Sequence, residues 1–318
     1  MRLRDFDLNL LIALDALLSE QSTTRAGKRL NLSQSALSCS LGRLRDYFQD
    51  DVLMQTGREL TPTQLGRSLA GPVRELLLQA EALLESSRVF DPVVSERHFV
   101  LLMSDYASSV LMVKAAQHIA RTAPHISFEL LPQVHLPWES LDSGEVDLLM
   151  MPEQFLSPDH PREPLYEDHY IGVVWSGHPE VGERISTEQF ESLGHVMARI
   201  DVQRRQSITI EESALKRAGL KRRVECVVPE FNAIPQYLIG TTRMAMMHAR
   251  LAALHCATGG LRTVQLPYEF PTVNEALQWH RHRDQDPGLS WLRAVLRSAA
   301  ADLGPGTAIR ARPAAAAA

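Results

Sequence analysis

Residues 23–38 read Thr-Thr-Arg-Ala-Gly-Lys-Arg-Leu-Asn-Leu-Ser-Gln-Ser-Ala-Leu-Ser, and this stretch decides the fold of the first part of the chain. It predicts a short helix to about Leu30, a tight turn at 31–32, and a second helix opened by Ser33, whose hydroxyl can cap the first turn. Two helices joined by so short a turn are typical of a helix-turn-helix, which lays its second helix in the major groove of DNA. A hairpin around Gly57 would add a wing to this unit.

The second helix is expected to divide its side chains between a core face and an outer face. Leu37, Leu41, Leu44 and Phe48 recur at spacings of four, three and four residues, which places them in one inward stripe. The opposite face is short and polar, as entry into a groove requires, and a glutamine there can pair with adenine. The predicted DNA contacts are Thr24, Ser33, Gln34, Ser35, Ser38, Arg43, Arg45 and, at the tip of the wing, Arg58. The alternative is that these side chains are only solvated.

A long helix is predicted after the wing. Thr61 and Gln64 are expected to form a capping box, with Pro62 in the first helical position. Beyond this point apolar residues alternate at spacings of four and three, a pattern typical of helices that pair with one another. These residues are Leu69, Val73, Leu76, Ala80 and Leu83. The sequence therefore predicts a dimerising linker helix that ends at 91–92.

Composition limits the class of protein. The chain has 318 residues, 45% of them hydrophobic and 22% charged, as expected for a globular protein with two or three domains. Its net charge is −5, but residues 23–67 carry seven arginines and lysines against four acids, so the basic excess lies on the expected DNA face. The three cysteines form no metal-type pair, and no cofactor is implied. Without a signal peptide or an apolar run of ~20 residues, a cytoplasmic protein with no membrane contact is expected.

After residue 95 the pattern changes to short apolar strands that alternate with helices. The first set has strands at 98–104, 126–131 and 146–151 and helices at 108–122 and 138–143. The second set has strands at 170–175, 195–200, 222–228 and 243–247 and helices at 207–218, about 231–239 and 251–257. One strand and one helix within 272–303 return to the first set. This alternation predicts parallel sheet, so we expect a two-lobed α/β domain with a small-molecule cleft at the strand ends.

Candidates for ligand contact lie at strand ends and helix starts, where polar side chains and free amides would face such a cleft. Ser104, Asp105 and Tyr106 follow the first strand, and the imidazole of His169, just before the strand at 170–175, could contact a carboxylate or phenol. Four further candidates open two later helices, where they could bind an anionic group or an aromatic ring: Arg204, Arg205, Phe231 and Asn232. For each residue the alternative is a helix cap or an interface side chain.

Residues 24–38, followed by Leu41 and Leu44, resemble the signature of LysR-type transcriptional regulators. Six further segments resemble the NodD-like branch of that family, which includes nodulation regulators and relatives that control aromatic degradation: 7–11, 57–60, 102–105, 127–132, 194–196 and 219–225. The sequence departs from the family at Gly27, where a small alanine is usual, and at Cys39, where larger or charged residues are common.

The resemblance implies a winged helix-turn-helix, a linker helix and a two-lobed effector domain similar to periplasmic binding proteins. It also implies activation of promoters, an aromatic or flavonoid-like inducer, and inducer contacts at Ser104 and His169. We expect homodimers that join into a homotetramer, bend double-stranded promoter DNA and alter the access of RNA polymerase. The expected boundaries are 1–62 for the DNA-binding domain, 63–91 for the linker and 92–306 for the effector domain, followed by a disordered tail at 307–318. Within the effector domain, lobe one would comprise 92–164 and 270–303, and lobe two 165–269.

Two other classes are alternatives: a small-molecule-binding enzyme and a transport receptor. The chain has no Gly-x-Ser-x-Gly elbow, no glycine-rich phosphate loop before a helix and no His-Glu-x-x-His. His280-x-His282 and His255-Cys256 could be pieces of a metal site, but separated pairs of this kind are far more often ordinary surface or core side chains. A transport receptor would need an export signal. We therefore expect a regulator and not an enzyme.

Overall fold

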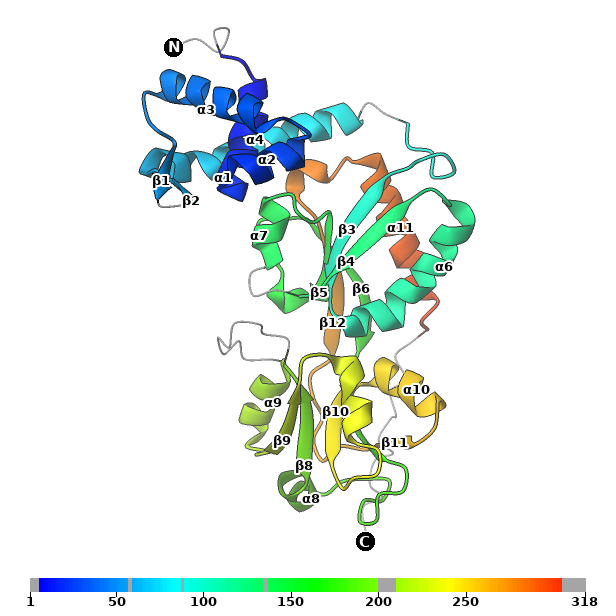
Figure 1. Cartoon of the computed structure of the whole chain (residues 1–318). Helices are drawn as coiled ribbons and strands as arrows, with labels where there is room; N and C mark the ends of the chain where they lie inside the picture. Colours follow the sequence, from blue (N-terminus) through cyan, green and yellow to red (C-terminus); the bar gives the residue numbers. More distant parts are fainter. Residues whose placement is uncertain (1–5, 57–58, 87–88, 134–136, 200–209, 305–318) are drawn as a thin grey trace. The chain divides into compact units, whose positions relative to one another are not determined.

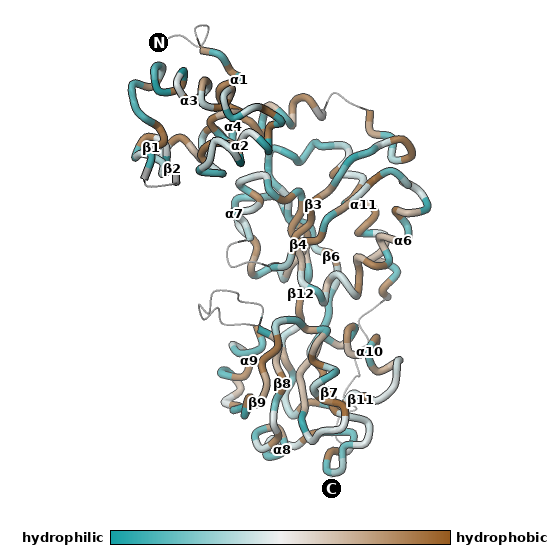
Figure 2. The backbone as a smooth tube through the Cα atoms, in the orientation of Figure 1, coloured by the Kyte–Doolittle hydropathy of each residue, from teal (hydrophilic) through white to brown (hydrophobic). Residues whose placement is uncertain are grey.

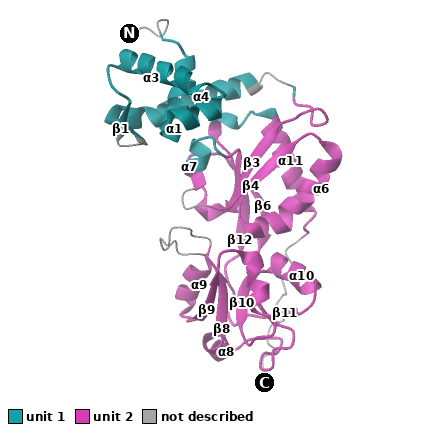
Figure 3. Ribbon diagram, viewed as in Figure 1, with its two compact units in different colours: residues 1–89, 139–145, 282–287 teal, residues 90–138, 146–281, 288–318 magenta. Residues whose placement is uncertain are grey.

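The computed structural model describes residues 6–56, 59–86, 89–133, 137–199 and 210–304. The chain forms two compact units (Figure 3). The first comprises 1–89, 139–145 and 282–287, and the second comprises 90–138, 146–281 and 288–318. Each unit has a hydrophobic core of its own. A search of the described residues finds no helix that could cross a membrane.

Three helices open the first unit, and the predicted turn lies between the second and the third. Asn31 ends the second helix with φ of 54°, a left-handed conformation that asparagine tolerates. Gly27 allows the chain to approach itself in this turn, because a Cβ there would lie 2.7 Å from the carbonyl oxygen of Leu32. The helices are α1 (Asn9–Glu20), α2 (Thr23–Leu30) and α3 (Gln34–Phe48) (Figure 1).

The predicted leucine stripe of α3 is confirmed. Leu37 and Leu44 are fully buried, Leu41 is 5% exposed, and Phe48 packs at the edge of the same cluster. They meet the buried apolar side of α1, including Leu14. Burying one such leucine side chain stabilises the fold by roughly 2 kcal/mol, so this stripe fixes which face of α3 can remain outside.

The predicted capping box at the start of the linker helix is wrong. Thr61 and Pro62 belong to a wing strand, where the proline pairs with the first residue of the other strand. Thr63 caps the helix instead: its hydroxyl accepts a hydrogen bond from Gly66 N at 3.0 Å and donates one to Asp50 at 2.7 Å. A proline is tolerated in the strand because both strands of a lone hairpin are edge strands. The strands are β1 (Leu53–Thr56) and β2 (Glu59–Pro62), and the helix is α4 (Gln64–Ser86).

The apolar stripe of α4 serves two surfaces. Val73 is 6% exposed and Leu69 is half-buried, and both pack in the core of the first unit. Leu76 and Leu83, in contrast, are 47% and 72% exposed, and the neighbouring Leu84 is 66% exposed. The first half of the stripe therefore covers the chain's own DNA-binding helices, whereas the second half is an apolar face exposed in the single chain.

The second unit contains two five-stranded sheets. In the first sheet the order is β4-β3-β5-β12-β6; β3 runs parallel to β4 and β5, and β12 runs antiparallel to β5 and β6. Helices α6 and α11 contribute to the core that covers it (Figure 1). Its strands are β3 (His98–Met103), β4 (Ser127–Leu131), β5 (Leu148–Pro152), β6 (Arg162–Asp168) and β12 (Val273–Gln278). Its helical elements are α5 (Asp105–Ala107), η2 (Ser108–Met112), α6 (Val113–Thr122), η3 (Glu153–Phe155) and α11 (Pro287–Ala301), while α7 (Pro137–Asp142) and η5 (Arg281–Arg283) span the division between the units.

The second sheet has the order β11-β7-β10-β8-β9. The chain passes from the first sheet to the second between β6 and β7, at His169, and returns between β11 and β12. Hydrophobic residues recur along the central strands of both sheets (Figure 2) and join in one core cluster. The strands are β7 (Tyr170–Trp175), β8 (Gly194–Ala198), β9 (Arg223–Val228), β10 (Met244–His248) and β11 (Leu261–Val264). The helices are α8 (Thr187–Ser192), α9 (Ile210–Ala218), η4 (Phe231–Tyr237) and α10 (Ala249–Ala257).

The sequence pattern misses two strands, the helix α8 and the antiparallel part of each sheet. β6 contains Pro164, which argues against a strand, but β6 lies at the sheet edge, where the absent N–H is not needed. β11 is only four residues long. α8 begins with a capping box between Ser186 and Gln189, a signal that was present in the sequence. The strands β7, β11 and β12 run antiparallel to their neighbours, so the expectation of parallel sheet is wrong for them.

Candidate DNA-reading surface and effector site

The outer face of α3 is polar and exposed. Ser33 caps the helix, its Oγ accepting a hydrogen bond from Ala36 N at 3.1 Å and lying 2.9 Å from the Oγ of Ser35. Gln34 and Ser38 are exposed on the same surface, opposite the buried leucines. Hydroxyl and amide groups on the first turns of an exposed helix are the groups that read base edges in a major groove.

The arginines predicted to contact DNA differ in the protein groups that they bind. Arg43 is exposed and pairs with Asp7, 2.9 Å from Nη2 to Oδ2. Arg45 instead fastens α3 to the start of the wing, since its guanidinium donates to the carbonyls of Asp51 at 2.9 Å and Leu53 at 2.6 Å. Arg45 therefore supports the wing, a structural role that the sequence pattern did not predict. Thr24 is exposed on α2, and Arg58 lies outside the described residues.

Six of the residues predicted to bind a ligand meet where the two sheets join. Ser104 caps α5, accepting from Ala107 N at 3.1 Å. The carboxylate of Asp105 accepts three hydrogen bonds from η4: from Phe231 N at 3.2 Å, and from Asn232 N and Nδ2, both at 2.8 Å. Asp105 follows a strand of the first sheet, so these bonds tie one lobe to the other.

Tyr106 and His169 belong to the same junction and share one acid. The Tyr106 hydroxyl donates to Asp168 Oδ2 at 2.8 Å, and the backbone N–H groups of His169 and Arg250 also donate to Asp168, at 2.8 and 3.3 Å. The ring of Tyr106 stacks on His248 with centroids 4.0 Å apart, and Phe231 packs edge-on against both rings. Burial raises the pKa of Tyr106 and lowers that of His248 to about 4, so both stay neutral at physiological pH.

The alternative of a helix cap or an interface side chain therefore holds for three of these residues, and their contact with a ligand stays a prediction. Ser104, Asp105 and Asn232 already have protein partners for their polar groups, whereas the imidazole of His169 is 28% exposed. Its nearest acid is Asp168, with Nδ1 3.9 Å from Oδ1. Arg204 and Arg205 lie outside the described residues.

Sequence reasoning missed the acids at the centre of this junction. Asp168 is 1% exposed and Glu275 is 2% exposed. Burial, together with the nearby Asp168, raises the pKa of Glu275 to about 8. A usable signal was present: Glu275 lies between Val273 and Leu277 on the inward positions of β12, where an acid is rare.

Two buried polar atoms of the junction have no hydrogen-bond partner in the part of the chain that the structure describes: His248 Nδ1 and Glu275 Oε2. Leaving such a group unpaired costs about 1 to 3 kcal/mol, so each of them would favour a hydroxyl or water that reached it. The junction therefore combines aromatic side chains and unpaired polar atoms with two carboxylates, Asp105 and Asp168, that are already held by protein donors. This chemistry fits a hydroxyl-bearing aromatic molecule better than a multiply charged anion.

Two of the histidines considered as fragments of a metal site, His255 and His282, have other partners. His255 Nε2 lies 3.0 Å from Asn232 Oδ1 and extends the junction network. His282 Nε2 lies 3.2 Å from Glu75 Oε1 on the linker helix. Burial raises the pKa of Cys256, which opposes the thiolate that a metal requires.

An exposed recognition helix on a winged helix-turn-helix, followed by a two-lobed α/β domain, defines a DNA-binding regulator. Residues 8–67 match the bacterial regulatory helix-turn-helix proteins of the lysR family, and residues 94–301 match the LysR substrate binding domain. The chain is 40% identical over 304 residues to nodulation protein D 1 of Bradyrhizobium elkanii, covering 96% of each protein. The chain belongs to the LysR family of transcriptional regulators.

Solved structures agree with this assignment. A probable transcriptional regulator from Pseudomonas aeruginosa is 26% identical, with a TM-score of 0.64 over 93% of this chain and 98% of that one. A full-length OxyR from the same organism has a TM-score of 0.72 over 93% of this chain and 94% of its own, and its 16% identity shows the fold alone. The predicted LysR-type, NodD-like resemblance and fold class are confirmed, and the family assignment supports a regulator over an enzyme or a transport receptor.

Proposed function

We propose that this LysR-type regulator reads promoter DNA with the outer face of α3 and senses a small molecule at the junction of the two lobes. The proposed DNA binding is supported by the exposed polar face of α3, which lies opposite its buried leucine stripe. The divisions proposed for these roles are 1–62 for DNA binding, 63–91 for the linker and 92–306 for the effector domain. Because a regulator acts where its promoter DNA lies, we propose that this protein acts in the cytoplasm.

The exposed half of α4 supports a homodimer. Leu76, Leu83 and Leu84 would be covered by the same face of a second copy, which is the geometry of paired helices with apolar residues at spacings of four and three. A two-fold pair presents two recognition helices to an inverted repeat, with half-sites about one helical turn apart. Contacts between effector domains would join two dimers into a homotetramer that bends the promoter and acts on RNA polymerase.

The ligand class follows from the junction chemistry and from the relatives. Aromatic side chains and neutral hydrogen-bonding groups favour a phenolic or flavonoid-like inducer, and relatives 40% identical are named nodulation proteins. The inducer must bind the two lobe arrangements unequally, because a ligand with equal affinity for both would shift nothing. Since the hydrogen bonds of Asp105 link the lobes, a ligand that rearranged them would change how the lobes meet, and we propose that this activates transcription.

Replacing Gln34 or Ser38 by alanine is expected to weaken operator binding by roughly 1 to 3 kcal/mol, because each side chain contributes base-edge contacts and neither supports the core. The measurement is the shift of a promoter fragment, with affinity recorded against salt; the wild-type affinity should fall steeply as salt rises. Ser192→Ala, an exposed helix serine of the second unit, is the matched control. Undiminished discrimination between operator and random DNA would refute the proposed face.

Replacing His169 by alanine is expected to abolish the inducer response and leave promoter binding intact. The backbone of His169 is held on both sides, by its own N–H to Asp168 and by its carbonyl, which accepts from Ala249 N at 2.9 Å. The change therefore removes the imidazole without releasing the crossing strand. Induction is measured as a dose response of a reporter to candidate aromatics, with the exposed His125→Ala as control. A wild-type dose response in the His169 variant would remove this residue from the site.

A further inference from the structure

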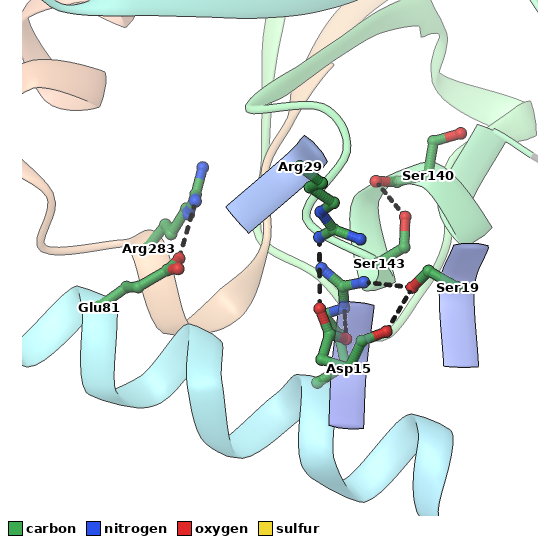
Figure 4. A network of polar contacts seen from close by, with 8 residues as sticks. Asp15, Ser19, Arg29, Glu81, Ser140, Ser143 and Arg283 are labelled. Atoms are coloured by element: carbon green, nitrogen blue, oxygen red, sulfur yellow. Dashed lines mark hydrogen bonds and ion pairs between the residues drawn. The ribbon is translucent and has the colours of Figure 1, made fainter. Parts of the chain in front are cut away.

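A buried charge cluster joins three helices of the first unit. Asp15 of α1 is 8% exposed, in the midst of the leucine core. Its Oδ1 lies 2.7 Å from Nε of Arg74 on α4, and its Oδ2 lies 3.2 Å from Nη2 of Arg29 on α2. Figure 4 shows Asp15, Arg29 and Ser19 in this cluster. The Ser19 Oγ accepts a hydrogen bond from Arg74 Nη2 at 3.0 Å and donates one to the backbone carbonyl of Asp15 at 2.9 Å.

The cluster is poorly explained as a source of stability. Removing an ion pair from water costs several kcal/mol per charge, and replacing such a pair with apolar side chains is often neutral or stabilising. What an ion pair adds is direction, because a guanidinium binds a carboxylate only from particular angles. Val73 and Leu69 of α4 contact the same core through apolar groups, which tolerate sliding and rotation. Arg74, whose side chain is 17% exposed, is the residue of α4 that pairs directly with Asp15 of α1.

The position of Arg74 along α4 matters for the dimer. It lies between Val73, which faces the chain's own core, and Leu76, where the exposed apolar face begins. The next residue, Glu75, lies 3.2 Å from His282, and Glu81 lies 3.4 Å from Arg283. Residues 282–287, which carry both of these partners, belong to the first unit and follow strand β12 along the chain.

We propose that Asp15, Arg29 and Arg74 are positioning residues that fix the angle between the helix-turn-helix and the linker helix, and so set the separation of the two recognition helices in the dimer. This inference rests on the proposed dimer through α4. Because α3 and the linker helix both pack against α1, a small rotation at Arg74 would displace α3 along the DNA, where successive base pairs are about 3.4 Å apart. The cluster therefore determines which spacing between half-sites the regulator accepts.

The test measures affinity for a panel of operators whose half-site spacing is changed by one or two base pairs in either direction. Full-length wild type is expected to prefer one spacing by about tenfold or more over the extremes, because its recognition helices have a fixed separation. Arg74→Gln should reduce that preference to about threefold or move its optimum, with binding to a single half-site unchanged within about twofold. Arg74→Lys, which keeps the charge and loses the forked geometry, should act in the same direction and more weakly.

A control variant separates the positioning role of Arg74 from its effect on the stability of the fold. Arg222→Gln breaks a second buried arginine–carboxylate pair, with Glu211 in the second unit, and should lower the melting temperature without altering the spacing preference. If Arg74→Gln fails to fold, Arg74→Lys carries the test. A wild-type spacing preference in both folded Arg74 variants, or in Arg74→Lys when it alone folds, would overturn the inference. A wild-type protein that binds no operator at any spacing would instead refute the proposed function.

Discussion

Replacing Glu275 by glutamine is expected to raise the free energy of unfolding by a few kcal/mol at pH 8 and to change it little near pH 4.5. Burial and the neighbouring Asp168 raise the pKa of Glu275 to about 8, against 4.5 for a free side chain. The native state therefore keeps a proton that the unfolded chain releases. Each pKa unit by which the native and unfolded states differ corresponds to about 1.4 kcal/mol of stability, which makes this one of the larger single-residue effects in the protein.

The sign follows from the direction of the shift. A carboxyl group whose pKa is raised on folding contributes stability that is fully present below pH 4.5 and is lost as the pH rises to about 8. Glutamine has no proton to lose, so the variant should show a flatter profile and the higher melting temperature at pH 8. The charged and titratable groups near Glu275 are Asp168, Tyr166, Tyr170 and Tyr106.

Thermal unfolding of wild type, Glu275→Gln and the exposed control Glu269→Gln at several pH values between 4.5 and 8 checks this expectation. The control should follow the wild-type profile throughout. Parallel profiles for Glu275→Gln and wild type would show that Glu275 is ionised in the native state, and its assignment as a neutral hydrogen-bonding group of the effector site would be wrong.

Replacing Asp105 by alanine is expected to lower the free energy of unfolding by about 2 to 3 kcal/mol, because it leaves the backbone N–H groups of Phe231 and Asn232 without their acceptor and takes one of several acceptors from the Asn232 amide. The stability costs of Asp105→Ala and Asn232→Ala should overlap. One of the three donors is the Asn232 amide side chain, so the two changes share part of their cost, and the double variant should be more stable than the sum of the single effects predicts.

Denaturant titrations of the two single variants and the double variant provide this measurement. Asp91→Ala is the matched control, since Asp91 accepts one exposed hydrogen bond from Val93 N at 3.0 Å and should cost about 0.5 kcal/mol or less. Strictly additive effects of the Asp105 and Asn232 changes would contradict the proposed link between the lobes. Asp105→Ala should also alter the inducer response, because the hydrogen bonds that it removes join the two lobes.

Local sequence signals predicted the DNA-reading part well. The spacing of Leu37, Leu41 and Leu44 required an inward stripe, and Ser33 had to cap the helix, because both features depend only on residues within a few positions of each other. The capping box at Thr61 and Gln64 failed for a complementary reason: pairing with a second strand extended the wing, and the cap moved to Thr63.

The effector site was predicted residue by residue but not as an arrangement. Ser104, Asp105 and Asn232 were found from their positions at element ends, yet their polar groups bond to protein, which no local pattern reveals. Asp168 and Glu275 are more than one hundred residues apart in the sequence and become neighbours only because β6 and β12 pair. Arg45 likewise has the sequence character of a DNA contact, and only the fold shows that it holds the wing.

The sequence by itself determined the helix-turn-helix, its outward polar face and the alternation that builds two lobes, because periodicity, caps and turns act over short distances along the chain. The tertiary structure alone decided which charges are buried together and in which protonation state they rest. Pairing and desolvation depend on neighbours that folding supplies from remote segments, as in Asp15 with Arg74 and Asp168 with Glu275.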